Sequence, residues 1–287
     1  MHVLPELLIN LAVPLVVALA VAGRGFRIDE EHVTKWASSA GLELTAERRP
    51  VVRRYLVWSR RSRTAGGLIG FLAPGVYSEV ASGEPLRDGG WSFALMLVGY
   101  LLGALVAEVV INRRARRLGS PALVSRRLGD YLPASVVTLQ RGLGALSAVL
   151  VVVYALLEPH ARVSMPDVMV VAAVGVAGAC FALVIEVLQR AIIAGRWAST
   201  AGDVPVDDAV RSSSVHVLAG AGIAMLLNVA GPMAILSLVT VVGSANVAAL
   251  IGLPLFLSVF VTSLLLWSHL VQPHGFRVRR GDQAVHA

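Results

Sequence analysis

The chain has few of the residues that most catalytic or structural chemistry requires. One cysteine, Cys180, occurs in 287 residues, so no intramolecular disulfide can form, and it falls within an apolar run as a small hydrophobic residue would. One lysine, Lys35, stands beside 24 arginines. The motifs HExxH, GxxxxGK[ST], CxxC and GxSxG do not occur. The sequence therefore predicts no catalytic residue, no cofactor and no metal site.

Charged residues are also scarce, and their scarcity assigns the protein class. Only 15% of residues are charged, 56% are hydrophobic, and the mean hydropathy is +0.73. Soluble proteins average about 25% charged residues. A lipid bilayer accommodates the excess, because lipid solvates the apolar side chains that face out of a helical bundle. The net charge of +7 lies mostly beside apolar runs, so we expect no nucleic-acid partner.

Seven apolar runs are candidates for transmembrane helices, which need about 20 residues to cross about 30 Å of hydrocarbon. The second run is short and rich in glycine, and Gly231-Pro232 in the sixth predicts a kink or an early helix end. The expected fold is all-α, with residues 1–287 forming a single membrane domain. The runs cover residues 3–22, 65–82, 91–111, 137–157, 168–188, 215–240 and 246–268.

The basic residues predict the orientation of these seven spans. With alternate connections on opposite sides, 23 of the 25 basic residues fall on one side, which the positive-inside rule makes cytoplasmic. The amino terminus is then outside and the carboxyl terminus inside, and this requires an odd number of spans. The Ala-, Val-, Leu- and Gly-rich composition, with arginine preferred to lysine, suits a high-GC bacterial genome, hence a bacterial cytoplasmic (inner) membrane.

Residues 1–22 have a second interpretation. Ala20-Val21-Ala22 resembles the cleavage site of a signal peptide. However, Arg24 and Arg27 follow the apolar run, and no basic residue precedes it. This order is the reverse of a secretory signal and favours a retained first span.

The first cytoplasmic connection, residues 23–63, predicts an amphipathic basic helical hairpin. One helix is expected from Glu30 to Ala40 and a second from near Thr45. Its basic face is suited to anionic lipid, where each arginine contributes about 1 kcal/mol. The alternative is a solvated face that only fixes topology. The candidate lipid contacts are Arg48, Arg49, Arg53, Arg54, Arg60 and Arg61.

Two parts of the chain are similar at a shift of 78 residues. Residues 99–148 and 177–226 share ten identities in fifty positions, among them Glu108 with Glu186. Each part would run as a span, a cytoplasmic connection and a span, and parallel repeats of this kind occur in transporters. Chance similarity between apolar segments of simple composition is the alternative.

Ionisable residues inside the spans are the candidate functional residues, because charge is unfavourable in hydrocarbon. Glu108, Glu186, Arg141 and His216 lie at similar depth and could form a polar cluster that opens toward the cytoplasm. Alternatively, each carboxylate pairs locally with an arginine or reaches the headgroups. Asn228, near the middle of the sixth span, predicts a hydrogen bond between helices.

Several segments resemble uncharacterised multi-pass membrane proteins of actinobacteria. The resemblance implies a multi-pass membrane protein and no particular activity. The segments are Glu43-Leu44-Thr45, Arg53-Arg54-Tyr55-Leu56, Arg63-Thr64-Ala65-Gly66-Gly67 and Asp207-Asp208-Ala209-Val210-Arg211-Ser212-Ser213-Ser214.

The stretch from Arg117-Leu118-Gly119 to Tyr131-Leu132-Pro133 resembles the coupling loop of ABC importer permeases. It covers under a tenth of the chain. The acidic start of that loop is absent, the preceding residues being arginines, and the spacing is one residue too long. A retinal Schiff base, as in seven-span microbial rhodopsins, is excluded because Lys35 lies in a connection.

Three function classes remain open from the sequence. The first is a non-enzymatic membrane component, such as a permease-like subunit, with a protein partner in a membrane complex. The second is a stand-alone small-solute transporter, which the possible repeat and the polar cluster favour. A lipid-modifying membrane enzyme is the third and has the least support, because no nucleophile, base or metal cluster is visible.

Overall fold

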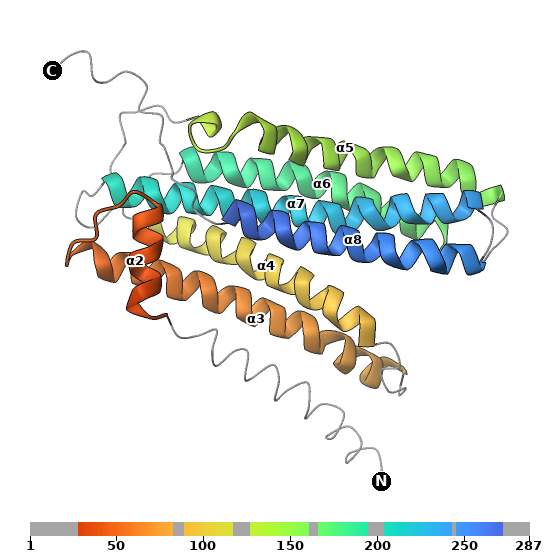
Figure 1. Cartoon of the computed structure of the whole chain (residues 1–287), viewed down its shortest axis with the longest axis horizontal. Helices are drawn as coiled ribbons and strands as arrows, with labels where there is room; N and C mark the ends of the chain where they lie inside the picture. Colours follow the sequence, from red (N-terminus) through yellow and green to blue (C-terminus); the bar gives the residue numbers. More distant parts are fainter. Residues whose placement is uncertain are drawn as a thin grey trace, which may run out of the picture. The chain divides into compact units, whose positions relative to one another are not determined.

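The structure, a computed structural model, describes residues 28–82, 89–116, 127–160, 166–194, 204–242 and 245–271. All regular elements in these ranges are helical, which confirms the predicted all-α class. The expected span at 3–22 lies outside the described residues. The elements are α2 (Glu30–Ser39), α3 (Arg48–Ser82), α4 (Gly89–Arg116), η1 (Leu128–Asp130), α5 (Ala134–Leu157), η2 (Glu158–His160), α6 (Val168–Ala194), α7 (Val204–Val242) and α8 (Ala245–Val271) (Figure 1).

Four described helices are long and apolar enough to cross a membrane. They are Ala134–Leu157, Val168–Ala194, Pro205–Val242 and Leu250–Val271, and they correspond to the last four expected spans with modest shifts at the ends. α4 contributes a shorter apolar stretch, Leu95–Ile111. The segment 65–82 is helical but is not among the four.

The chain divides into two compact units. The first comprises Met1–Pro121 and Arg196–Val210, and the second comprises Ala122–Gly195 and Arg211–Ala287. In the first unit, α3 and α4 pack as an antiparallel pair in which Gly66 lies against Gly99. A methyl group on either glycine would overlap the carbonyl oxygen of the other, and Gly70 and Gly103 meet backbone in the same way. Two helical backbones approach this closely only where small residues form the contact.

α3 differs from the sequence expectation. A basic helix in the connection 23–63 and a separate span at 65–82 were expected, but one helix of 35 residues runs from Arg48 to Ser82. The change from basic to apolar residues near Ala65 contains no proline and no turn, so the helical hydrogen bonds continue through it. Arginine favours a helix about as well as leucine does, and a change of polarity alone does not end one.

α2 packs against the amino-terminal part of α3 and forms a small extramembranous-type head with its own core. Trp36 of α2 lies over Tyr55 of α3, with ring centroids 5.8 Å apart. Glycine is required at Gly41, directly after α2, because φ there is +62°. The buried residues of this core are Val33, Ala37, Leu42, Val52, Tyr55, Val206 and Val210.

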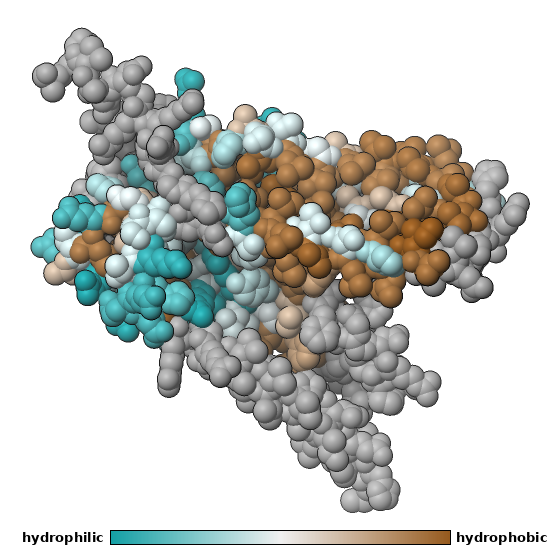
Figure 2. Space-filling view, in the orientation of Figure 1, coloured by the Kyte–Doolittle hydropathy of each residue, from teal (hydrophilic) through white to brown (hydrophobic). Residues whose placement is uncertain are grey.

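The second unit contains α5, α6, α8 and α7 from Arg211 onward. Its large apolar side chains lie on both sides of the helices: Tyr154 and Leu226 are buried, whereas Leu183 and Leu250 are 67% and 75% exposed. Figure 2 shows hydrophobic residues spread over the faces of α5 to α8 that are in view. Monomeric soluble proteins rarely expose such continuous apolar surface, and lipid is the medium that suits it.

α7 does not end at Pro232, where the sequence left an early end open. The helix continues to Val242 with Pro232 inside it. The adjacent Gly231 lies against Val259 of α8, so the missing side chain is used for a close helix contact. Neighbouring helices commonly make an interior proline tolerable in a membrane helix.

Candidate functional site

Glu108, on α4 in the first unit, is fully buried and has several donors around it. Tyr55 Oη and Ser59 Oγ donate to its Oε1 at 3.2 and 3.3 Å, and Arg63 Nη2 lies 3.8 Å from the same oxygen. These three residues recur every fourth position, so helix α3 presents them on one face. The carboxylate is therefore matched by a guanidinium and two hydroxyls, as a buried charge requires.

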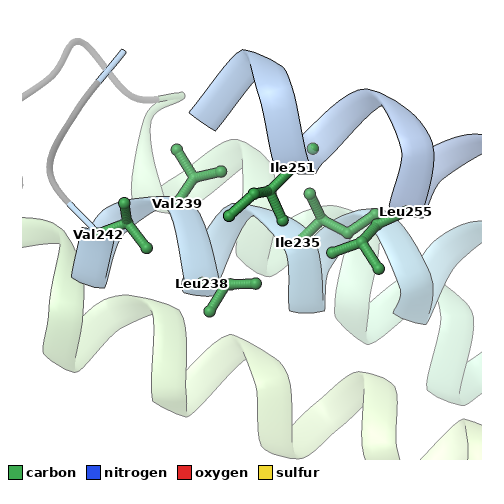
Figure 3. Close-up of a pocket in the computed structure, with 7 residues that line it drawn as sticks. Ile235, Leu238, Val239, Val242, Ile251 and Leu255 are labelled. Carbon is green, nitrogen blue, oxygen red and sulfur yellow. The ribbon is translucent and has the colours of Figure 1, made fainter. Parts of the chain in front are cut away.

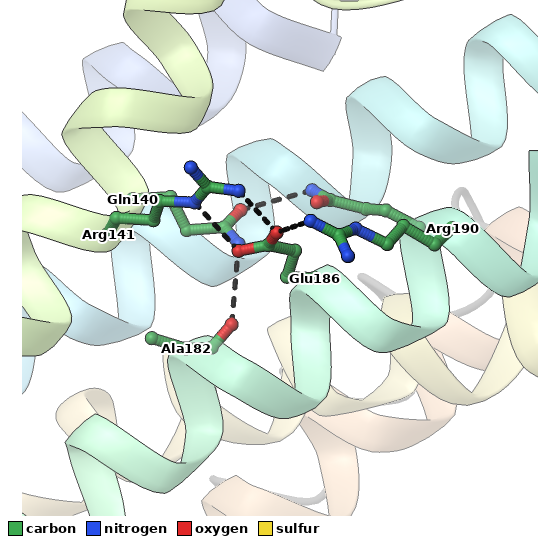
Figure 4. Close-up of polar contacts among 6 residues, drawn as sticks. Gln140, Arg141, Ala182, Glu186 and Arg190 are labelled. Carbon is green, nitrogen blue, oxygen red and sulfur yellow. Dashed lines mark hydrogen bonds and ion pairs between the residues drawn. The ribbon is translucent and has the colours of Figure 1, made fainter. Parts of the chain in front are cut away.

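Glu186, on α6 in the second unit, pairs with two arginines (Figure 4). Arg141 of α5 donates from Nε to Oε2 at 2.9 Å and from Nη2 to Oε1. Arg190, one turn further along α6, donates to Oε1 as well. The side chain of Glu186 is 12% exposed, but those of Arg141 and Arg190 are 57% and 64% exposed. The carboxylate thus lies at the edge of the helix pair.

A pair of buried amides lies one residue from each of these arginines. Gln189 Nε2 donates to Gln140 Oε1 at 3.0 Å, and Gln140 Nε2 donates to the carbonyl of Ala182 at 3.4 Å (Figure 4). Both side chains are about 1% exposed, and Gln189 Oε1 accepts no hydrogen bond in the described part of the chain. The sequence analysis missed this pair, although two glutamines within apolar runs were a visible signal.

The four residues of the predicted polar cluster are placed as follows. Glu186 and Arg141 are in direct contact, whereas Glu108 belongs to the other unit and faces Arg63. The ring Nδ1 of His216 lies 2.8 Å from the carbonyl oxygen of Ser212 on its own helix. For both carboxylates, the printed sequence also offered the alternative of a local arginine partner, and both have one.

Asn228 joins two helices of the second unit. Its Nδ2 donates to Ser263 Oγ on α8 at 2.9 Å and to the carbonyl of Ala224 at 2.8 Å. Such an amide contact stabilises a membrane helix pair by roughly 0.6 kcal/mol.

The two arginine–glutamate pairs are related by the same numerical shift as the sequence similarity. Arg63 and Glu108 lie 78 residues before Arg141 and Glu186. The helices that carry the glutamates also correspond, since α4 ends at Arg116 and α6 ends 78 residues later at Ala194. Glycines follow the same interval at positions 66, 144 and 222.

Arg211 is a buried arginine to which the sequence analysis gave no role beyond topology. It is 1% exposed, and its Nη1 donates to the carbonyls of Ile192 and Ile193 at 2.9 and 3.0 Å. These carbonyls belong to the last turn of α6, where no intrahelical donor remains for them. A cation there also suits the negative end of the helix dipole.

Two cavities differ sharply in character. One, between α7 and α8, has room for about 10 Å³ and is lined by apolar residues such as Ile235, Val239 and Leu255, so it is a packing gap that holds at most one water (Figure 3). The other is a groove of about 810 Å³ in the head. Three of the candidate lipid contacts, Arg49, Arg53 and Arg54, line it, and so does Arg61. Neither cavity is lined by Glu108 or Glu186.

No protein-family model, curated protein or solved structure matches this chain. In the described ranges, histidine, cysteine, aspartate and glutamate residues form no group of three that could hold a metal ion.

Proposed function

We propose that this protein is a non-enzymatic component of a bacterial cytoplasmic membrane, such as a permease-like subunit, that presents its α2–α3 head to a cytoplasmic partner. The observation that carries the proposal is the head itself. α2 and the first turns of α3 enclose their own core, while basic residues cover the outside. A connection that only linked two spans would need neither a core nor a groove.

The proposed topology has seven spans, with the amino terminus outside and the carboxyl terminus in the cytoplasm. The four long apolar helices support the membrane location, and the basic connections support the orientation. The register of α3 and α4 sets Arg63 and Glu108 at one level, which suits the cytoplasmic interface. The 17 apolar residues Leu95–Ile111 would cover only about 25 Å, so this hairpin would need local thinning or a shallow position.

We further propose that the helical hairpin is the repeated element. α3–α4, α5–α6 and α7–α8 follow one another at intervals of about 78 residues, and the first two share the arginine–glutamate pair. The third hairpin has Ala219 and Leu264 at the corresponding positions, so the pair is not a general requirement of the fold.

A stand-alone small-solute transporter is the second candidate, and the repeat favours it, because parallel repeats occur in transporters. The arrangement of the carboxylates favours the first candidate, because each is engaged by arginine and lines neither cavity. A lipid-modifying enzyme stays the third alternative.

Cysteine labelling tests the topology. In a Cys180→Ala background, Glu31→Cys on α2 and His160→Cys on η2 are expected to lie on opposite sides of the membrane. A membrane-impermeant maleimide should label His160→Cys in intact cells and Glu31→Cys only after permeabilisation. Equal labelling of both in intact cells would overturn the topology.

Purification and reconstitution test the role. The tagged full chain, extracted in a mild detergent, is expected to bring a cytoplasmic or membrane protein with it in stoichiometric amount. Deleting residues 30–47 should release that partner while the remaining chain stays in the membrane. Solute uptake by liposomes that contain this chain alone, with loss of uptake in Glu186→Gln, would instead establish the transporter.

A further inference from the structure

The groove of the head is a concave, positively charged surface between the start of α2 and the basic half of α3. Figure 2 shows hydrophilic residues gathered over this part of the molecule. Its volume of about 810 Å³ lies within the range of about 300–1,000 Å³ that small-molecule sites occupy. Its lining residues are Ile28, Asp29, Glu30, Arg49, Pro50, Arg53, Arg54, Val57, Trp58 and Arg61.

The charges of the groove are unevenly matched. Four arginines face two carboxylates, and Arg49 is engaged by Glu30, with Nη1 and Oε2 3.5 Å apart. Within the described part of the chain, Arg53, Arg54 and Arg61 have no ion-pair or hydrogen-bond partner from their side chains. The groove therefore holds three guanidinium groups available to an anion.

Helical spacing explains why these groups converge. Arg54 and Arg61 are seven residues apart, two turns along one face of α3, and Arg53 lies beside them. Between them lies Trp58, whose side chain is 38% exposed. An aromatic ring flanked by arginines can accept the apolar or planar part of a ligand while the guanidinium groups hold its charge.

We propose that this groove is a binding site for a phosphate-bearing anion, with Arg53, Arg54 and Arg61 donating to phosphate oxygens and Trp58 contacting the rest of the ligand. Guanidinium groups match the oxygens of phosphate with paired N–H donors, and such charge-assisted bonds are about twice as strong as neutral ones. Phosphate groups come from soluble phosphorylated molecules and from lipid headgroups, and the continuity of α3 bears on which source is in reach.

Arg54 and Arg63 are separated by nine residues of one unbroken helix, or about 14 Å along its axis. The headgroup layer on each side of a bilayer is only about 5–7 Å thick. If Arg63 lies at the interface, as the proposed topology requires, Arg53 and Arg54 stand beyond the headgroups. That height favours a soluble phosphorylated ligand, whereas phosphate binding in the groove does not itself depend on the topology.

Fluorescence of Trp58 provides the test, measured on the full chain in nanodiscs of phosphatidylcholine and read as the difference between the protein and its Trp58→Phe variant. Inorganic pyrophosphate is the soluble probe, and nanodiscs that contain phosphatidylglycerol are the lipid probe. We expect a saturable response to pyrophosphate. Arg53→Gln with Arg54→Gln should weaken it by about 10-fold or more, whereas Arg48→Gln with Arg60→Gln, the same charge loss outside the groove, should weaken it less than about 3-fold.

A gain of binding guards against misfolded variants. Glu30→Gln removes the carboxylate that engages Arg49, and it should tighten pyrophosphate binding by about 2- to 5-fold. A Trp58 response to phosphatidylglycerol alone, dependent on Arg53 and Arg54, would assign the same chemistry to a lipid headgroup. No response to either probe, or equal losses in the two double variants, would overturn the site. The cysteine-labelling pattern would be unaffected, so failure of the site is separable from failure of the topology.

Discussion

Glu108 and Glu186 occupy equivalent positions under the 78-residue shift but have different surroundings. Glu108 is fully buried with Arg63, whose side chain is 15% exposed, whereas the two arginines around Glu186 are mostly exposed. Burial strengthens an ion pair and also raises the penalty for breaking it, while solvent screens an exposed pair. The same chemical pair therefore has different value in the two hairpins.

The substitutions Glu108→Gln and Glu186→Gln test this difference. Glu108→Gln leaves the mostly buried Arg63 without a carboxylate and should lower the free energy of unfolding by about 1–3 kcal/mol. Glu186→Gln should lower it by less than about 1 kcal/mol, because its partners remain hydrated. Thermal unfolding in detergent measures both. A larger loss for Glu186→Gln would contradict the burial argument.

Arg211 gives a second prediction at this scale. Arg211→Met removes a buried guanidinium that bonds two carbonyls of the last turn of α6, so we expect a loss of about 2–4 kcal/mol. Hydrogen exchange should rise selectively near Ile192 and Ile193, because that end of α6 loses its cap. Arg190→Met is the control, since that side chain is 64% exposed. Unchanged exchange at the end of α6 would show that other groups hold it.

Among the helices, the α3–α4 pair depends on the absence of side chains at its contact. Gly99→Ala places a methyl group into the carbonyl oxygen of Gly66, so we expect a loss of about 1–3 kcal/mol from separating the backbones. Gly67→Ala should instead be neutral or stabilise by up to about 1 kcal/mol. Its nearest neighbour, Tyr100 Cβ, is 3.5 Å away, and alanine favours a helix over glycine.

Opposite signs for these two glycine variants, measured as shifts in the melting temperature in one detergent, distinguish close packing from helix propensity. Gly142→Ala on α5 is a further control, because a methyl group there meets nothing within 4 Å. If Gly99→Ala were as stable as Gly67→Ala, the backbone contact would be wrong.

The elements show which features could be predicted from the sequence. The helices of the last four spans were predictable, because long apolar runs in lipid have helix as their only open-chain solution. The continuity of α3 was missed, because a change from arginine to apolar residues was treated as a boundary between elements. Helix formation responds to backbone hydrogen bonding and not to polarity, and no residue between Arg63 and Ala65 interrupts it.

The site was partly predictable for a related reason. Charge inside an apolar run is conspicuous, so Glu108, Glu186 and Arg141 were singled out. Their partners Tyr55 and Ser59 come from a segment distant in sequence and could not be chosen without the register of α3 against α4. Neutral amides such as Gln140 give little signal in a hydropathy profile, although burial makes their hydrogen bonds as consequential.

For the whole molecule, the lipid-facing surface yields a depth prediction. Cys180 is exposed and lies near the middle of α6, so it should lie near the centre of the bilayer. A nitroxide attached there in reconstituted protein should collide with dissolved oxygen more often than with a water-soluble nickel chelate. A nitroxide at Glu31→Cys in the Cys180→Ala background should show the reverse. Equal exposure of both labels to the chelate would contradict a bilayer-embedded α6.

The unbroken α3 also has a mechanical consequence. A straight helix of 35 residues is about 52 Å long and resists bending, so its two ends act as the arms of one lever. Because its glycines leave almost no clearance against α4, a push on the arginine arm is passed to that contact instead of being absorbed by a hinge.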